Sequence, residues 1–206
     1  MKLYFTRHGE SEATTRRIIS NRNLPHPLTQ TGRQQAEALA KKLTGKSITR
    51  IYTSPIPRAK ETAEILSAVL KAPVEYADGL REPDCGVLEG REDEAAWAEH
   101  NYWKEAWFMG RQLECGPQDG ETCDEVRERL SGFIGNLIND YGETDAEFLL
   151  VTHGALILFG LLEVCTGVDQ LTLIDHGLDH TALITTELQN GELVYLGCSI
   201  GETGLE

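Results

Sequence analysis

The sequence predicts an α/β fold, a three-layer sandwich whose mostly parallel central sheet has helices on both faces and an antiparallel edge. Apolar segments of strand length alternate along the chain with segments of helical periodicity, an order typical of parallel sheets. Two late apolar segments are joined by Asn190-Gly191, a pair that favours a tight hairpin turn. No repeat or linker interrupts residues 1–206. We therefore expect a single domain, with roughly residues 77–122 forming a cap over the site.

The expected strands are short and rich in apolar, β-branched and aromatic residues, as buried strands usually are. They lie at residues 2–6, 51–53, 73–76, 148–152, 182–187 and 193–197. The expected helices lie at residues 32–44, 57–69, 92–110, 122–140 and 154–162. Thr31 is the expected N-cap of the first helix, and Pro57 stands at a first-turn position that proline favours. Residues 77–90 contain three glycines and a proline, which predict a loop.

Composition and charge argue against several classes of protein. No apolar run reaches the length of a membrane span. The net charge of −14 disfavours binding to nucleic acid or to anionic membranes. Five widely spaced cysteines without a Cys-x-x-Cys motif predict reduced thiols in a cytoplasmic protein. For Cys85 we favour packing over a reactive role, and we expect no metal and no cofactor.

Basic residues follow three of the expected strands closely. Arg7 and His8 come after the first strand, Arg58 shortly after the second, and His153 after the strand at 148–152. In open α/β sheets, ligands bind beyond the carboxyl ends of the strands, and helix N-termini at these ends favour anions. The sequence therefore predicts a crevice that binds a phosphate group.

The same residue types suit phosphoryl transfer. Arginine holds phosphate oxygens through paired hydrogen bonds. Nearby Arg7 and Arg58 should keep His8 in the neutral form that can attack phosphorus. Gly9 is expected to leave the imidazole uncovered, since a side chain there could fold over it. Cationic side chains can stabilise the transferred group without a metal ion.

The leaving oxygen needs a proton, and the loop at 77–90 offers a carboxylic acid to supply it. Glu82 is the expected donor, with Asp84 and Glu89 as rivals on the same loop. After the transfer, the same carboxylate could activate the water that hydrolyses phosphohistidine.

An ordered set of motifs resembles the histidine phosphatase superfamily, the phosphoglycerate-mutase-like group, over about residues 2–160. The motifs are Thr6-Arg7-His8-Gly9-Glu10-Ser11, Pro27-Leu28-Thr29-Gln30-Thr31-Gly32, Thr53-Ser54-Pro55-Ile56-Pro57-Arg58-Ala59, Leu80-Arg81-Glu82, Gly120-Glu121-Thr122 and Val151-Thr152-His153-Gly154. One such motif alone would be weak evidence, whereas six in order are specific. Many family members have Asn where this chain has Thr14, so a phosphate contact there is expected to be weaker or reshaped.

The resemblance implies a role for each matched residue. His8 would accept the phosphoryl group, and Glu82 would donate the proton. Arg7, Arg58 and His153 would clamp the phosphate. The full set of expected substrate-binding residues is Arg7, Ser11, Thr14, Ser20, Asn21, Arg58, Glu82, His153 and Gly154.

The sequence favours hydrolysis over isomerisation. Mutases of the family resemble longer chains with further arginines for a second phosphate, whereas residues 89–94 here are mostly acidic. We therefore expect a phosphatase of a small phosphorylated metabolite, with a phosphoglycerate mutase as the first alternative and a non-catalytic phospho-ligand binding protein as the second. The substrate and the oligomeric state stay open, although exposed aromatic residues would suit a homodimer.

Other aromatic residues and histidines receive lesser roles. The segment at 92–110 carries aromatic residues that could wall an apolar pocket, namely Trp97, Tyr102, Trp103, Trp107 and Phe108. His26 and His100 are expected to be plain surface residues. Residues 175–180 are expected to form a loop, with His176 and His180 more suited to structural roles than to a metal site.

Overall fold

A computed structural model of the chain describes residues 1–22, 24–176 and 178–199. In this described part, a seven-stranded sheet has the order β3-β2-β4-β1-β6-β7-β5. The strands are β1 (Lys2–Arg7), β2 (Ile48–Thr53), β3 (Val74–Tyr76), β4 (Glu147–Thr152), β5 (Cys165–Thr166), β6 (Leu183–Gln189) and β7 (Glu192–Ser199). Only β6 runs against its neighbours β1 and β7, and the other described pairs are parallel.

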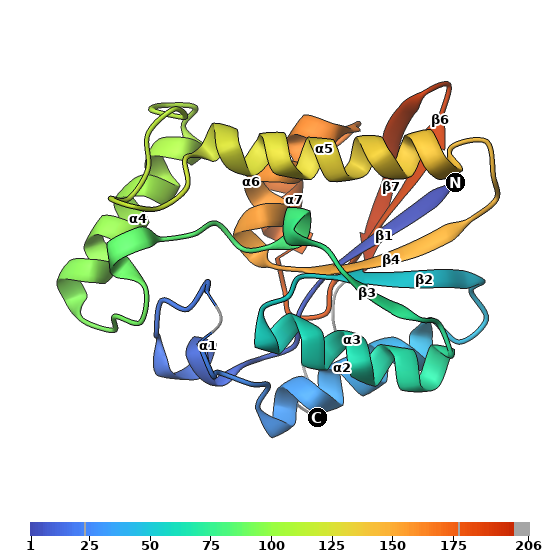
Figure 1. Cartoon of the computed structure of the whole chain (residues 1–206), viewed down its shortest axis with the longest axis horizontal. Coiled ribbons are helices and arrows are strands. Elements are labelled where there is room, and N and C mark those ends of the chain that lie inside the picture. Colours follow the sequence, from blue (N-terminus) through green and yellow to red (C-terminus); the bar gives the residue numbers. More distant parts are fainter. Residues whose placement is uncertain (23, 177, 200–206) are drawn as a thin grey trace.

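Helices cover both faces of the sheet (Figure 1), which confirms the expected three-layer α/β fold. They are α1 (Glu12–Arg16), α2 (Gln30–Lys42), α3 (Pro57–Leu70), α4 (Glu94–Phe108), α5 (Cys123–Tyr141), α6 (Gly154–Val164) and α7 (Gln170–His176), with short 3-10 turns at Asp78–Leu80 and Gly86–Leu88. Alternate residues of β1 point to opposite faces. Leu3 and Phe5 join the core under α5 and α6, and Tyr4 joins the core under α2 and α3.

Some expected boundaries were wrong. Helix α2 begins at Gln30, because the hydroxyl of Thr29 accepts a hydrogen bond from the amide of Gly32 at 3.0 Å and makes Thr29 the N-cap. Thr31 therefore lies inside the helix. Residues expected to be a loop before β6 include the end of α7, and the short strand β5 had no counterpart among the expected strands.

The segment after β3 leaves the sheet and forms α4. Figure 1 shows α4 beyond the end of the sheet, on the same side as α1. Asp93 is the N-cap of α4, and its carboxylate accepts a hydrogen bond from the amide of Ala96 at 3.1 Å. Among the described residues, no helix is both long and apolar enough to span a bilayer.

Candidate active site

The carboxyl ends of β1 and β4 bring two histidines together. The strands pair in parallel up to Arg7 and Thr152, and the amide of His8 continues the ladder by donating to the carbonyl of Thr152 at 3.0 Å. His8 and His153, the next residues along each strand, then have ring centroids 5.1 Å apart. The parallel register thus places both imidazoles at one point of the sheet edge.

The His8 ring is held as a neutral imidazole with its lone pair on Nε2. Its Nδ1 lies 2.7 Å from the carbonyl oxygen of Gly9, which can only accept a hydrogen bond, so Nδ1 carries the proton. Its Nε2 accepts a hydrogen bond from Nε of Arg58 at 2.8 Å. Burial, reinforced by the charge of Arg58, lowers the pKa of His8 well below its ordinary value.

Gly9 is required for a reason other than the one expected from the sequence. A Cβ atom on Gly9 would lie 2.4 Å from the carbonyl oxygen of Gly32, and one on Gly32 would lie 2.0 Å from the carbonyl oxygen of Glu10. Two backbone segments therefore meet here with no space for side chains. Gly9 lets the loop after β1 pack against the start of α2, and this contact explains the glycine without any need to keep the imidazole uncovered.

Helix α3 delivers Arg58 into the site. Pro57 occupies the first turn of α3, so Arg58 projects from the helix start and is only 5% exposed. Its guanidinium donates to His8, to the carbonyl of Ser20 and, at 3.5 Å, to Oδ1 of Asn21. Burial lowers the pKa of Arg58 to about 10, so the side chain stays charged at neutral pH.

Two buried nitrogens near His8 have no hydrogen-bond partner among the described residues: Nε of Arg7 and Nδ1 of His153. Arg7 donates through Nη1 to the carbonyl of Leu178 at 2.6 Å. Nε2 of His153 lies 2.8 Å from the hydroxyl of Ser54, and burial, followed by the charge of Arg58, lowers the pKa of His153 well below its ordinary value. Buried nitrogens normally find partners, and the described residues leave these two unpaired.

Glu82 is fixed at the start of α6. Its two carboxylate oxygens accept hydrogen bonds from the amides of Ala155 and Leu156 at 3.2 and 3.1 Å. The rival carboxylates are used elsewhere. Asp84 pairs with Arg22 at 2.8 Å. Glu89 accepts hydrogen bonds from the backbone amides of Asn21 and Cys85.

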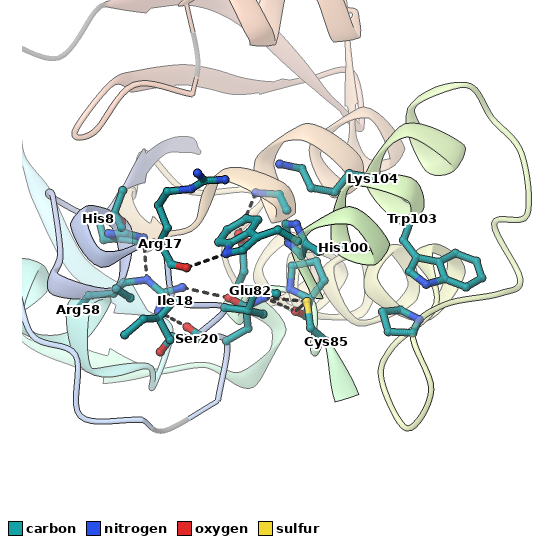
Figure 2. Close-up of a pocket in the computed structure, with 18 of the residues that line it drawn as sticks. His8, Arg17, Ile18, Ser20, Arg58, Glu82, Cys85, His100, Trp103 and Lys104 are labelled. Atoms are coloured by element: carbon teal, nitrogen blue, oxygen red, sulfur yellow. Dashed lines mark hydrogen bonds between the residues drawn. The ribbon is translucent and has the colours of Figure 1, made fainter. Parts of the chain in front are cut away.

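A cavity of about 210 Å³ lies in front of this group (Figure 2). Arg7, His8, Arg58 and Glu82 line it, together with the expected contact residues Thr14, Ser20 and Asn21. Ser11, His153 and Gly154 are not among the described lining residues. Ser11 is fully buried as the N-cap of α1, with its Oγ 3.0 Å from the hydroxyl of Thr14. Gly154 lies beside Arg7, whose Nε would be 3.5 Å from an added Cβ.

The model of the histidine phosphatase superfamily (branch 1) matches residues 3–200. The chain belongs to this superfamily. A probable phosphoglycerate mutase, GpmB of Photorhabdus laumondii, is 34% identical over 154 residues, which cover 75% of this chain and 70% of the relative. YhfR of Bacillus stearothermophilus is 26% identical, with a TM-score of 0.78 and 93% of both chains covered. The alpha-ribazole phosphatase of Shigella flexneri shares the fold, with a TM-score of 0.78, 23% identity and 100% of both chains covered.

This member of the histidine phosphatase superfamily has a second set of cavity residues, of which the sequence predicted the three tryptophans but not the other residues. One face of α4 supplies Trp97, His100, Trp103, Lys104 and Trp107, and the segment directly after α1 supplies Arg17 and Ile18. The α4 residues recur at intervals of three and four, the spacing that places side chains on one helix face. That periodicity was the available signal. Of the aromatic residues expected to wall a pocket, Tyr102 and Phe108 do not line this cavity in the described structure.

The prediction that His100 is a plain surface residue was wrong. His100 lines the cavity, and its Nδ1 is buried without a partner among the described residues. Burial, followed by the charge of Lys104, lowers the pKa of His100 to about 4. His26 is half-buried rather than simply exposed, with its Nδ1 2.9 Å from the hydroxyl of Ser20.

His180 approaches the nucleophile from the loop before β6. Its ring centroid lies 5.6 Å from that of His8, and its Nδ1 lies 3.0 Å from the His8 carbonyl oxygen. The side chain of His176 lies outside the described residues. Cys85 is buried and receives a hydrogen bond from Asn21, and burial raises its pKa, which favours packing over reactivity. No cluster of three or more metal-binding side chains occurs in the part of the chain that is described.

Proposed function

We propose that the protein is a metal-independent phosphomonoester hydrolase that acts on a small phosphorylated metabolite through a phosphohistidine intermediate. The observation that carries this proposal is the neutral His8 ring, whose Nε2 lone pair lies among Arg7, Arg58 and His153. The shared fold with phosphatases such as the ribazole phosphatase supports it.

In the first step, Nε2 of His8 attacks phosphorus. The N–P bond forms while the bond from phosphorus to the ester oxygen breaks. Glu82 gives its proton to that oxygen, which leaves as an alcohol. Arg58 donates to Nε2 in the free protein, so phosphate binding must redirect this N–H to a phosphate oxygen. Arg7 and Arg58 then stabilise the charge on the transferred group.

In the second step, the Glu82 carboxylate takes a proton from water, and the water oxygen attacks phosphorus. The N–P bond breaks, its electron pair returns to Nε2, and inorganic phosphate leaves. Glu82 is again protonated and His8 again neutral, so the cycle closes without a further reactant.

The test is hydrolysis of p-nitrophenyl phosphate in the presence of a chelator. We expect activity to survive chelation, and rapid quenching to trap a phosphoenzyme that acid destroys and alkali preserves. His8→Ala should lose both the adduct and the activity while its circular dichroism spectrum stays that of the unaltered protein. Full activity in His8→Ala, or complete loss with the chelator, would overturn the proposal.

A phosphoglycerate mutase is the second candidate, because curated relatives carry that name and because two cations beyond the phosphate clamp, Arg17 and Lys104, line the cavity. From the sequence, the acidic residues 89–94 were expected to disfavour a second anion. These residues are not among the described residues that line the cavity. Isomerisation of phosphoglycerate that depends on bisphosphoglycerate and outpaces hydrolysis would establish the mutase. Thermal stabilisation by phosphate, without turnover of any substrate, would instead indicate a binding protein.

A further inference from the structure

The cavity gathers positive charge in a protein that is strongly acidic. The described lining contains four arginine and lysine residues, Arg7, Arg17, Arg58 and Lys104, and one acidic residue, Glu82. The whole chain has a net charge of −14. Arg7 and Arg58 are the cations placed to meet a phosphate dianion, which leaves Arg17 and Lys104 without an assigned anion.

Among the described residues, neither of these outer cations has a carboxylate as an ion-pair partner. Figure 2 shows the amine of Lys104 extending toward the guanidinium of Arg17. Like charges that share a cavity raise the affinity for an anion between them.

Arg17 is held in place by α4. The indole N–H of Trp97 donates to the carbonyl of Arg17 at 2.7 Å, and the guanidinium of Arg17 lies 5.5 Å from the centroid of the Trp97 ring. Arg17 also adopts a left-handed backbone conformation, with φ of 54°, where glycine or asparagine is usually favoured. The cation is therefore pre-positioned at the cavity, although its side chain stays accessible to solvent.

Apolar surface lies in the same outer part of the cavity. Trp97, Trp107 and Ile18 line it. His100 lies beside the Trp97 ring at 4.9 Å between centroids, and its Nδ1 has no partner among the described residues. Apolar walls with a few convergent polar groups are typical of ligand sites.

We propose that this outer compartment binds the alcohol part of the substrate, and that the substrate is a phosphate monoester whose alcohol has an apolar body ending in an acidic group. The apolar body lies against Trp97, Trp107 and Ile18, and the acidic group binds Arg17 and Lys104. This inference rests on the proposed hydrolysis at His8 and adds the substrate class.

Three esters with nearly the same leaving oxygen test the inference: benzyl phosphate, 4-carbamoylbenzyl phosphate and 4-carboxybenzyl phosphate. We expect kcat/KM for the carboxy ester to exceed that for the carbamoyl ester about tenfold. The preference should shrink as salt is added, because the outer cations are solvent-accessible. 3-Phosphoglycerate, which is acidic but lacks the apolar body, should be hydrolysed with a lower kcat/KM than the carboxy ester.

Matched variants test which residues cause the preference for the carboxy ester over the carbamoyl ester. Arg17→Met and Lys104→Met should each lower the carboxy-to-carbamoyl ratio about threefold to fivefold, as expected for exposed ion pairs. Lys41→Met, an equal charge change at the far end of α2, should leave the ratio unchanged. A ratio near one in the unaltered protein, an effect of Lys41→Met equal to that of Lys104→Met, or a preference for 3-phosphoglycerate would overturn the inference. If the protein hydrolyses p-nitrophenyl phosphate but none of the benzyl esters, the inference fails and the proposed function stands; if it hydrolyses neither in a His8-dependent manner, the proposed function itself fails.

Discussion

At the scale of single residues, the site depends on keeping a buried histidine neutral beside two arginines. The carbonyl of Gly9 fixes the His8 tautomer, and burial with the charge of Arg58 lowers the pKa of His8. The lone pair at Nε2 therefore persists well into the acidic range. In the free protein, a hydrogen bond from Arg58 occupies that lone pair. In the proposed mechanism, Arg58 therefore donates to His8 in the free protein and to the phosphate once the substrate is bound.

Glu82→Gln tests the assignment of the proton donor. Glutamine keeps an oxygen that can accept from the α6 amides but cannot donate an acidic proton, so kcat for an alkyl or benzyl phosphate should fall about a hundredfold or more. p-Nitrophenolate leaves without needing a proton, so the rate of phosphoryl transfer from p-nitrophenyl phosphate should fall much less. The measurement is the rate of phosphoenzyme formation for both esters.

Asp84→Asn and Glu89→Gln are the matched controls for that experiment. Their carboxylates bind Arg22 and loop amides rather than the cavity. These variants are expected to alter both esters alike. If the loss of rate depends on the leaving group in Glu89→Gln and not in Glu82→Gln, Glu89 is the proton donor instead of Glu82.

At the scale of elements, helix α5 offers a stability test remote from the site. Thr122 and Glu125 form a reciprocal capping box at its start, with hydrogen bonds of 3.2 and 2.8 Å to each other's amides. Thr122→Ala should lower the free energy of unfolding by about 1 kcal/mol and leave kcat unchanged. Glu128→Ala, an exposed change on the same helix, should change it by less than about 0.5 kcal/mol. Equal effects of the two substitutions would show that the box adds no stability.

Elements also show where sequence reasoning succeeded and failed. The helices at 57–69 and 122–140 were placed within about two residues, because proline chemistry and apolar periodicity are local signals. The start of α2 was misplaced because both Thr29 and Thr31 can cap, and the choice between them depends on the hydroxyl of Thr29, which also donates to a Glu10 carboxylate oxygen at 2.6 Å. Tertiary contacts of this kind leave no mark in local sequence.

At the scale of the whole molecule, the inner and outer parts of the cavity differed in how far the sequence could predict them. The inner residues stand at strand ends, and a parallel sheet necessarily brings such ends to one edge. The outer residues depend on α4 packing against the segment that follows α1, which joins Trp97 and Arg17 across 80 positions of the chain. No periodicity encodes that contact. The resulting concentration of positive charge could be seen only after the fold was known.

The buried histidines also couple the whole fold to pH. His8, His26, His100, His153 and His180 all have lowered pKa values, chiefly through burial, and for His100 and His180 the value is about 4. Below the ordinary histidine pKa, the unfolded chain binds protons that the folded chain does not. The free energy of unfolding should therefore fall as the pH drops from about 6.5 toward about 4.

Urea unfolding from about pH 7 to about pH 5.5 measures this dependence, in a range where most carboxylates stay ionised. Each of these histidines contributes up to about 1.4 kcal/mol per pH unit where only the unfolded chain is protonated. His100→Gln removes one titrating group, so its unfolding free energy should decline with falling pH about a fifth to a quarter less steeply, whatever its absolute stability. An undiminished slope in His100→Gln would mean that His100 is already protonated or exposed in the folded protein. That result would also show that His100 is not a buried neutral imidazole in the wall of the outer cavity.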